Sequence, residues 1–266
     1  MSNGATKVTD IRFSVIIPAY NAEKTITRAL ESVIAQSYTP FQIIVVDDAS
    51  TDKTGQLVKD IFSAHLALST MYIKVTQNSG SSIARNTAMN LAGGDYIAFL
   101  DADDTWHSDK LMIMNIIISA HPGLSIIWHP FTQDDIVNKH FPGYPQVHQL
   151  PFYKLIPRNL IATSCAIIKN EPSFRFDPAM RYTEDFDLWL RIGYKKKIWY
   201  IDEPLTRIYR GFTTKGGISE HKWEMRKGEM KAYIKLIQLN PAFILLIPFL
   251  LLFSIVKHIS RYVQGR

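Results

Sequence analysis

The stretch Tyr96-Ile97-Ala98-Phe99-Leu100-Asp101-Ala102-Asp103-Asp104 joins an apolar run to three carboxylates within four residues. Such a run is typical of a buried strand, and ligands of open parallel sheets bind outside the carboxyl ends of their strands. Carboxylates this close raise one another's pKa unless a cation neutralises them, and Mg²⁺ binds carboxylate oxygens together with substrate phosphates. The stretch therefore predicts a metal–phosphate site. The alternative is a solvated acidic loop that caps the next helix.

Three more apolar runs precede this stretch, and helical patterns lie between them. Continuous rather than alternating apolarity indicates strands that are covered on both faces, as in parallel sheets. The alternation of strand and helix predicts a doubly wound sheet. The expected strands are 13–17, 42–46, 71–75 and 96–100, and the expected helices are 23–36, 52–62 and 82–91.

The pattern is looser after Asp104. The segment 131–157 is rich in Pro, His and aromatic residues and is expected to be an irregular surface segment. The other expected elements are helices at 110–119 and 182–192 and strands at 125–128, 164–168 and 198–201.

Length and charge limit the classes of function. A chain of 266 residues can form one large α/β domain or two small ones. The formal charge of +6 suits an anionic ligand or an anionic membrane surface. It is too diffuse to indicate a nucleic-acid partner, and no nucleic-acid recognition motif accompanies it. No G-x-G-x-x-G follows the first strand, which argues against a Rossmann dehydrogenase.

Polar clusters follow all four expected strands, and two further motifs come later in the chain. Because the carboxyl ends of parallel strands share one edge, the first four clusters should lie together where a nucleotide would bind. In chain order the motifs are Pro18-Ala19-Tyr20-Asn21, Asp47-Asp48-Ala49-Ser50-Thr51-Asp52, Asn78-Ser79-Gly80-Ser81-Ser82 with Ala84-Arg85-Asn86, the triplet 101–104, Glu184-Asp185 and Tyr209-Arg210.

This ordered set resembles the second family of inverting, nucleotide-sugar-dependent glycosyltransferases, over roughly residues 13–219. The resemblance implies the GT-A fold, an α/β fold with a Rossmann-like, mostly parallel sheet flanked by helices. It also implies a DXD metal site that would hold Mg²⁺ or Mn²⁺ through Asp103, with Asp101 close by. Such an ion would neutralise the leaving diphosphate of a nucleotide-sugar donor.

The donor site is expected at the first three clusters. The resemblance implies that Asp48 accepts a hydrogen bond from a uracil-like base; the alternative is a cap on the following helix. Tyr20 would pack on the base or in the core. Gly80 opens a helix whose N–H groups could meet phosphate, and Arg85 would bind phosphate oxygens or form a surface ion pair. Pro18, Asn21 and Ala102 are assigned to the same site.

The acceptor site is expected at Glu184-Asp185. The resemblance implies that Asp185 is the general base that takes the proton of the acceptor hydroxyl. Glu184 would orient this base or hold an acceptor hydroxyl. The alternative is that both side chains only provide favourable negative charge in the first turn of a helix.

The chain departs from the family pattern after Tyr209-Arg210. Many members carry a His two residues later that contacts metal or diphosphate, and here that place is Phe212. The third protein contact to the metal is therefore in doubt. Arg210 or Lys215 is expected to bind the diphosphate instead.

The C-terminal region changes character, because residues 236–256 form an uncharged stretch of 21 residues, near the length of a membrane-spanning helix. Pro241 and Pro248 interrupt it, and both flanks are basic, which favours a re-entrant hairpin or monotopic insertion with both ends cytoplasmic. A single span and a buried or oligomer-forming helix pair remain alternatives.

The sequence thus predicts a GT-A domain at 12–220, with a nucleotide-binding half at 12–105 and an acceptor half at 106–220. A helical membrane-associating segment is expected at 221–266. The expected reaction is inverting transfer of a sugar, from a UDP-sugar, to a hydroxyl of a lipid-linked glycan acceptor in bacterial surface polysaccharide synthesis. The expected location is the cytoplasmic face of the inner membrane. A metal-dependent nucleotidyltransferase or nucleotide-sugar diphosphatase is the alternative, and homo-oligomer formation stays open.

Overall fold

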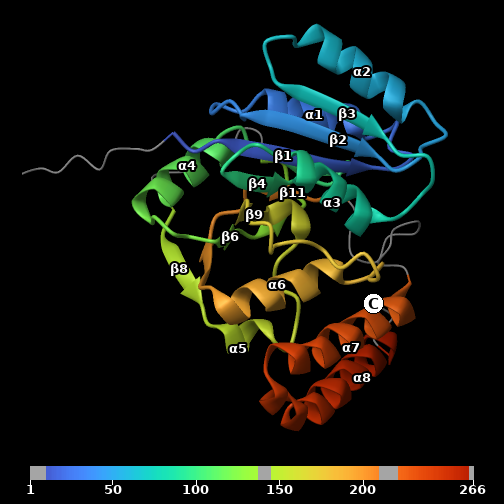
Figure 1. Cartoon of the computed structure of the whole chain (residues 1–266), viewed down its shortest axis with the longest axis vertical. Helices are drawn as coiled ribbons and strands as arrows, with labels where there is room; N and C mark the ends of the chain where they lie inside the picture. Colours follow the sequence, from blue (N-terminus) through green and yellow to red (C-terminus); the bar gives the residue numbers. More distant parts are fainter. Residues whose placement is uncertain (1–9, 137–144, 210–220, 264–266) are drawn as a thin grey trace, which may run out of the picture.

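The computed structural model describes residues 10–136, 145–209 and 221–263, and an eight-stranded sheet runs through its middle (Figure 1). The strand order is β3-β2-β1-β4-β9-β6-β10-β8. The first four of these strands are parallel, whereas β9 is antiparallel to both of its neighbours and β8 is antiparallel to β10. The bounds are β1 Phe13–Ala19, β2 Gln42–Asp47, β3 Thr70–Lys74, β4 Tyr96–Phe99, β6 Ile126–Trp128, β8 Val147–Leu150, β9 Ala166–Lys169 and β10 Ile198–Ile201.

The strands of the nucleotide-binding half form where continuous apolarity predicts them. Strand β1 extends beyond its expected end and includes Pro18. It pairs with β4 only as far as Ile16, so Pro18 lies where β1 has lost one of its two neighbours. A proline, which has no backbone N–H, is tolerated at such a position.

Helices cover both faces of the sheet, as the alternating side chains of the central strands require. Val15 and Ile17 face α1 (Ile26–Ile34), α2 (Thr54–Ala64) and α4 (Lys110–Ala120), whereas Ile16 faces α3 (Ser81–Leu91) and α6 (Glu184–Lys195). The predicted doubly wound α/β architecture is therefore confirmed. Strands from both expected halves share one sheet, and the boundary at residue 105 stays a prediction.

The expectation of an irregular segment at 131–157 is wrong in part. This segment contributes β7 (Phe131–Thr132), β8 and the short helix α5 (Phe152–Leu155). Strand β7 joins β11 (Thr206–Arg207) and β5 (Thr105–Trp106) in a small second sheet. These strands are held by partners distant in sequence, so a local pattern could not predict them.

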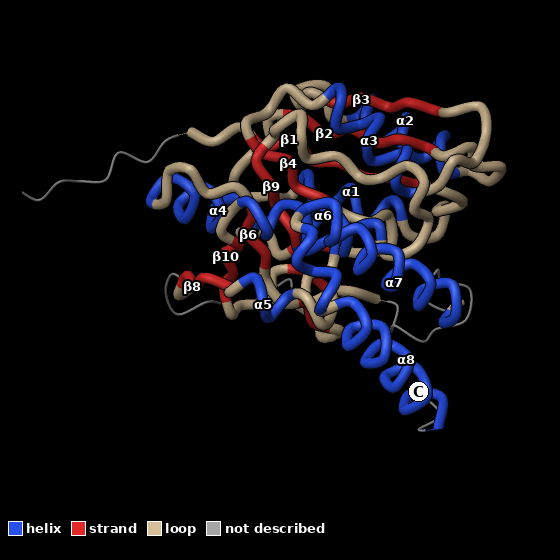
Figure 2. Tube along the Cα trace, turned by 60° about the horizontal axis from the view of Figure 1, so that its bottom comes forward, coloured by secondary structure: helices blue, strands red, loops and turns tan. Residues whose placement is uncertain are grey.

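The C-terminal region forms α7 (Lys222–Leu239), the 3₁₀ helix η3 (Pro241–Leu245) and α8 (Ile247–Val263). Helix α7 packs on α6, and α8 packs on α7 and extends away from the sheet (Figure 2). The uncharged stretch is broken at Pro241, where the Asn240 side chain accepts a hydrogen bond from the N–H of Ala242. Within the described ranges, no helix combines the length and the apolarity that a membrane crossing requires.

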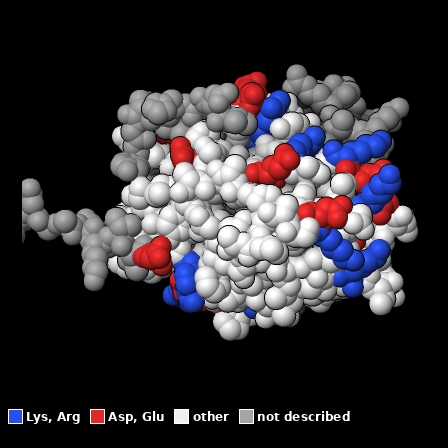
Figure 3. All heavy atoms as spheres, turned by 90° about the horizontal axis from the view of Figure 1, so that it is seen from above, with Lys and Arg blue, Asp and Glu red and all other residues white. Residues whose placement is uncertain are grey.

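The charged side chains on the face that is uppermost in Figure 1 are of both signs. In Figure 3 basic and acidic groups adjoin each other in clusters toward the edges of this face, and uncharged residues cover its middle. This face therefore offers a mixed surface rather than the basic stripe that tracks a nucleic-acid backbone.

Candidate active site

The polar clusters at the strand ends line one cavity of about 1100 Å³. A cavity of this size has room for a nucleotide-sugar, since pockets for small ligands measure roughly 300–1,000 Å³. The structure brings together nearly all of the predicted site residues, namely Pro18, Tyr20, Asn21, Asp48, Gly80, Arg85, Asp101, Ala102, Asp103, Glu184 and Asp185. The remaining one, Arg210, lies outside the described residues, as do Phe212 and Lys215.

The loops after β1 and β2 are tied to each other by hydrogen bonds. The N–H of Asn21 donates to Ser50 Oγ at 2.9 Å, and the Asn21 side-chain oxygen accepts from the N–H of Thr51 at 2.9 Å. Asn21 and Ala49 both have positive φ, of 46° and 63°. Non-glycine residues in this region are uncommon and cluster at functional sites. The Tyr20 side chain is about half exposed at the cavity, which excludes the alternative of core packing.

Asp48 holds the loop that opens α3. Its two carboxylate oxygens accept hydrogen bonds from the N–H groups of Ser79 and Gly80, each at 2.8 Å. Gly80 has φ of 90°, a conformation that glycine adopts without strain. Asp52, and not Asp48, binds the first N–H of α2, the helix after β2. It accepts a hydrogen bond from the N–H of Thr54 at 3.0 Å. The contact of Asp48 with a base stays a prediction. Each oxygen of the Asp48 carboxylate has a second lone pair that these two bonds do not use, so it could accept a further hydrogen bond.

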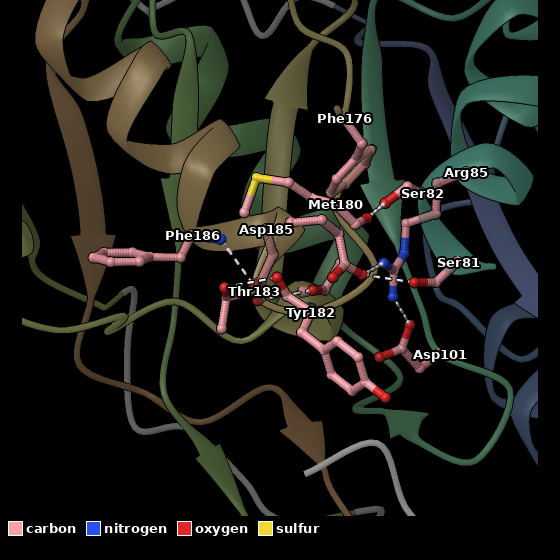
Figure 4. Close-up of polar contacts among 12 residues, drawn as sticks. Ser81, Ser82, Arg85, Asp101, Phe176, Met180, Tyr182, Thr183, Asp185 and Phe186 are labelled. Carbon is pink, nitrogen blue, oxygen red and sulfur yellow. Dashed lines mark hydrogen bonds and ion pairs between the residues drawn. The ribbon is translucent and has the colours of Figure 1, made fainter. Parts of the chain in front are cut away.

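Arg85 joins the donor side of the cavity to the acceptor side (Figure 4). Its guanidinium is nearly fully buried and donates to Asp101 Oδ1 at 2.7 Å and to Glu184 Oε1 at 2.9 Å. Ser81 Oγ donates to the same Glu184 oxygen at 2.6 Å. Burial opposes the charge of Arg85, but the two carboxylates outweigh it and raise the pKa of Arg85 above its ordinary value. A phosphate contact of Arg85 stays a prediction, because here its donors meet carboxylates.

The triplet 101–104 concentrates negative charge at the end of β4. Asp104 is buried, and burial together with the charges of Asp101 and Asp103 raises its pKa to about 8. Ser164 Oγ donates to Asp104 at 2.6 Å and accepts from the N–H of Asp101 at 3.0 Å, so it fixes the turn of the triplet. This repulsion among neighbouring carboxylates is what a divalent cation would relieve, as the sequence predicts.

The described residues contain no cluster of three or more His, Cys, Asp or Glu side chains that could by itself hold a metal ion. The two carboxylates assigned to the metal, Asp101 and Asp103, are among those that line the cavity. This donor set fits Mg²⁺, which is usually bound through one or two carboxylates, with substrate phosphates and water as its other ligands. The assignment of both residues to the metal stays a prediction.

Asp185 lies in the first turn of α6 and faces the same cavity. Its Oδ2 atom accepts from Asn159 Nδ2 at 3.0 Å and from Thr163 Oγ1 at 3.3 Å. Burial and the charge of Glu184 raise its pKa to about 6, against the lowering effect of Arg85. A carboxylate with such a pKa is a much better proton acceptor near neutral pH than an ordinary aspartate.

Three residues of the site were missed by the sequence reasoning, namely Asn159, Thr163 and Ser164. They orient Asp185 or the triplet from 22 to 63 residues away in the chain. No local pattern marks them, because Ser and Thr in an apolar stretch are equally typical of a satisfied core residue. The one available signal is that Ser164 is a polar residue at the start of the expected strand 164–168.

A family model described as glycosyl transferase family 2 matches residues 14–163, which is more than half of the chain. The chain is 35% identical over 233 residues to the amylovoran biosynthesis glycosyltransferase AmsB of Erwinia amylovora, with 82% of this chain and 75% of that protein covered. It is 29% identical over 270 residues to the UDP-Glc:alpha-D-GlcNAc-diphosphoundecaprenol beta-1,3-glucosyltransferase WfgD of Escherichia coli, with 97% and 99% covered.

Solved structures share the fold at low sequence identity. TarS 1-349 of S. aureus in complex with UDP superposes with a TM-score of 0.66 at 19% identity, over 96% of this chain and 92% of that one. The mannosyltransferase PcManGT of Pyrobaculum calidifontis, in complex with GDP-Man and Mn²⁺, gives 0.65 at 19% identity, over 96% and 76%. Together with the motifs and the cavity, these likenesses lead to one conclusion: the chain belongs to glycosyl transferase family 2 and is a glycosyltransferase.

Proposed function

We propose that the chain transfers a sugar from a UDP-sugar to an acceptor hydroxyl with inversion at the anomeric carbon. The observation that carries this proposal is the Arg85 bridge. Arg85 pairs with Asp101 of the acidic triplet and with Glu184, the residue before Asp185, and all of these groups line one cavity. The triplet is where a leaving diphosphate would be neutralised. A transferase requires both parts, whereas a nucleotidyltransferase or diphosphatase requires no base for an acceptor.

The donor would bind at the ends of β1, β2 and β4. Asp48 would accept the ring N–H of uracil, Tyr20 would pack on the base, and the N-terminus of α3 at Gly80 would meet phosphate. The choice of UDP is supported by WfgD, whose name describes a UDP-Glc donor, and by the UDP complex of TarS. Arg210 or Lys215 would bind the diphosphate.

Asp103 and Asp101 would hold Mg²⁺ or Mn²⁺ beside the diphosphate. When bound, this ion neutralises the charge that develops on the leaving group. The Mn²⁺ complex of PcManGT, a protein of the same fold, supports a divalent ion as the cofactor. Arg85 keeps Asp101 oriented by a short ion pair, so one Asp101 oxygen is already positioned by the protein.

Asp185 would take the proton of the acceptor hydroxyl while that oxygen attacks the anomeric carbon from the face opposite the diphosphate. A single displacement of this kind inverts the configuration. Asn159 and Thr163 hold one oxygen of Asp185, and the N–H of Phe186 donates to the other at 2.7 Å. Glu184, whose Oε1 atom is held by Arg85 and Ser81, would fix the start of α6 or bind an acceptor hydroxyl.

The acceptor would be a lipid-linked glycan at the cytoplasmic face of the inner membrane, in the synthesis of a surface polysaccharide. The names of AmsB, which describes amylovoran biosynthesis, and of WfgD, which describes a diphosphoundecaprenol acceptor, support this class of substrate. We take residues 12–220 as the catalytic domain.

The experiment is a product analysis with purified protein, Mg²⁺ or Mn²⁺, a panel of UDP-sugars and a lipid extract. Glycosyl transfer breaks the bond between the anomeric carbon and the diphosphate, so it releases UDP only when an acceptor is present, and the new linkage has inverted configuration by NMR. A diphosphatase would instead release UMP and a sugar 1-phosphate without an acceptor. Release of UMP, or a retained configuration, would overturn the proposal.

A further inference from the structure

The outer face of η3 and α8 is apolar and exposed. Ile244 and Leu245 of η3 are 59% and 77% exposed, and Phe249 and Leu252 of α8 are 71% and 62% exposed. With 3.6 residues per turn, the exposed residues of α8 cover an arc of about 160°. They are Pro248, Phe249, Leu252, Phe253, Ile255 and Val256. Contiguous apolar patches of this kind indicate an interaction surface rather than scattered exposed residues.

The inner face of α8 is held to the rest of the protein by buried polar groups. Ser254 is fully buried, and its Oγ donates to Glu229 of α7 at 2.6 Å. Glu229 also pairs with Arg226. The single hydroxyl proton of Tyr233 is shared between Glu229 at 3.2 Å and the carbonyl of Pro157 at 3.0 Å. If α8 left α7 to cross a bilayer, Glu229 would lose the hydrogen bond from Ser254 and the buried Arg226–Glu229 pair would lose its cover, which is costly. Helix α8 is therefore expected to stay on α7.

The net basic charge of the chain belongs to the same part of the sequence. Residues 221–266 carry eight Lys and Arg side chains against two glutamates, so the whole formal charge of +6 belongs to them. The preceding 220 residues have equal numbers of basic and acidic side chains. An anionic lipid surface attracts such a segment, with roughly 1 kcal/mol for each Lys or Arg near the surface. Two copies of this segment facing each other would repel.

The segment is also next to the cavity. His221 and Met225, at the start of α7, line the cavity, and α7 carries α8. From these observations we propose that the outer face of η3 and α8 inserts into one leaflet of an anionic membrane while α8 remains packed on α7. A lipid-borne acceptor would then reach the cavity past the start of α7. The inference deepens the proposed function, but its test requires neither donor nor acceptor.

The test measures binding of the full chain to vesicles by co-sedimentation. Vesicles that contain phosphatidylglycerol should bind the protein at least about tenfold more tightly than phosphatidylcholine vesicles, and added salt should weaken this preference. The variant Phe249→Glu/Leu252→Glu should bind at least about tenfold more weakly, because it places two charges at the apolar face.

The matched control is Leu66→Glu/Met71→Glu. It adds the same charge at two exposed apolar residues near α2 and β3, at the opposite end of the molecule (Figure 1). This control should bind like the unchanged protein. Circular dichroism and the thermal midpoint of both variants report whether they are folded. Equal binding by the two variants, or loss of binding by both, would overturn the proposal.

Depth is measured with a fluorophore on Leu252→Cys, since the single native cysteine, Cys165, is buried. Lipids brominated in the acyl chain should quench this label and leave a label on Leu66→Cys unquenched. Sedimentation velocity without lipid tests the alternative that a second copy of the chain covers this face. A dimer that the Phe249→Glu/Leu252→Glu variant dissociates, together with an unquenched label at residue 252, would refute membrane insertion while leaving the transferase reaction untouched.

Discussion

The substitution Asp185→Asn tests the proposed base, because it should lower turnover while it raises the stability of the folded protein. Turnover should fall by about 10²- to 10⁴-fold, the usual contribution of a general base. The affinity for UDP-sugar should barely change, because the Asp185 oxygens contact Asn159, Thr163 and the start of α6 rather than the donor clusters. The folded protein should at the same time become more stable at neutral pH.

The stability gain follows from the pKa of Asp185. Burial raises this pKa from 3.8 to about 6, so the ionised carboxylate is less favourable in the folded protein than in the unfolded chain. A shift of about two units corresponds to roughly 3 kcal/mol of destabilisation above pH 6, and none below pH 4, where the group is protonated in both states. The Asn side chain loses part of the contacts with Asn159 and Thr163, at about 1 kcal/mol. The expected net gain is about 1–2 kcal/mol.

The assay is a pair of measurements over pH 4–8. Thermal unfolding should show Asp185→Asn melting about 2–8 °C above the unchanged protein at pH 7.5. The difference should vanish at about pH 4–5 and reverse at lower pH, where only the lost contacts of the Asn side chain remain. The acid limb of kcat for the unchanged protein should have its midpoint near pH 6, where Asp185 loses its proton. A variant that melts lower at pH 7.5 and keeps its turnover would refute the assignment, because Asp185 would then be a structural group.

Three further predictions concern the neighbours of this base. Asp103→Asn should remove most activity and leave the unfolding midpoint nearly unchanged, EDTA should have the same effect on activity, and turnover that survives both would exclude the metal role. Arg85→Lys should lose about 1.5–3 kcal/mol of stability in urea unfolding, because one ammonium cannot span Asp101 and Glu184 as the guanidinium does; unchanged stability would contradict the bridge. Gly228→Ala in α7 should reduce the free energy of unfolding by about 1–3 kcal/mol and lower kcat more than donor affinity. The new Cβ would lie 2.4 Å from both Thr183 Oγ1 and the carbonyl oxygen of Tyr182, just before α6, the helix that carries Asp185.

The sequence by itself determined the class of fold and the edge of the sheet at which the site lies. Continuous apolar strands alternating with helices are typical of a parallel sheet covered on both faces, and the carboxyl ends of parallel strands lie at one edge. The clusters around Tyr20, Asp48, Gly80 and Asp101 therefore converge for a reason that is local and periodic. The position of Asp185 in the first turn of a helix followed from the same kind of pattern.

The tertiary structure decided which of these groups touch and what each side chain does there. Arg85 was expected at phosphate or in a surface ion pair, but it is buried between Asp101 and Glu184, 16 and 99 residues away in the chain. Such contacts depend on how layers pack, and no periodicity encodes them. Residues 242–256 are apolar all round as a sequence, and only packing on α7 gave α8 a buried face at Ser254 and an exposed face at Leu252. Burial is a property of the folded neighbours, so composition alone cannot assign it.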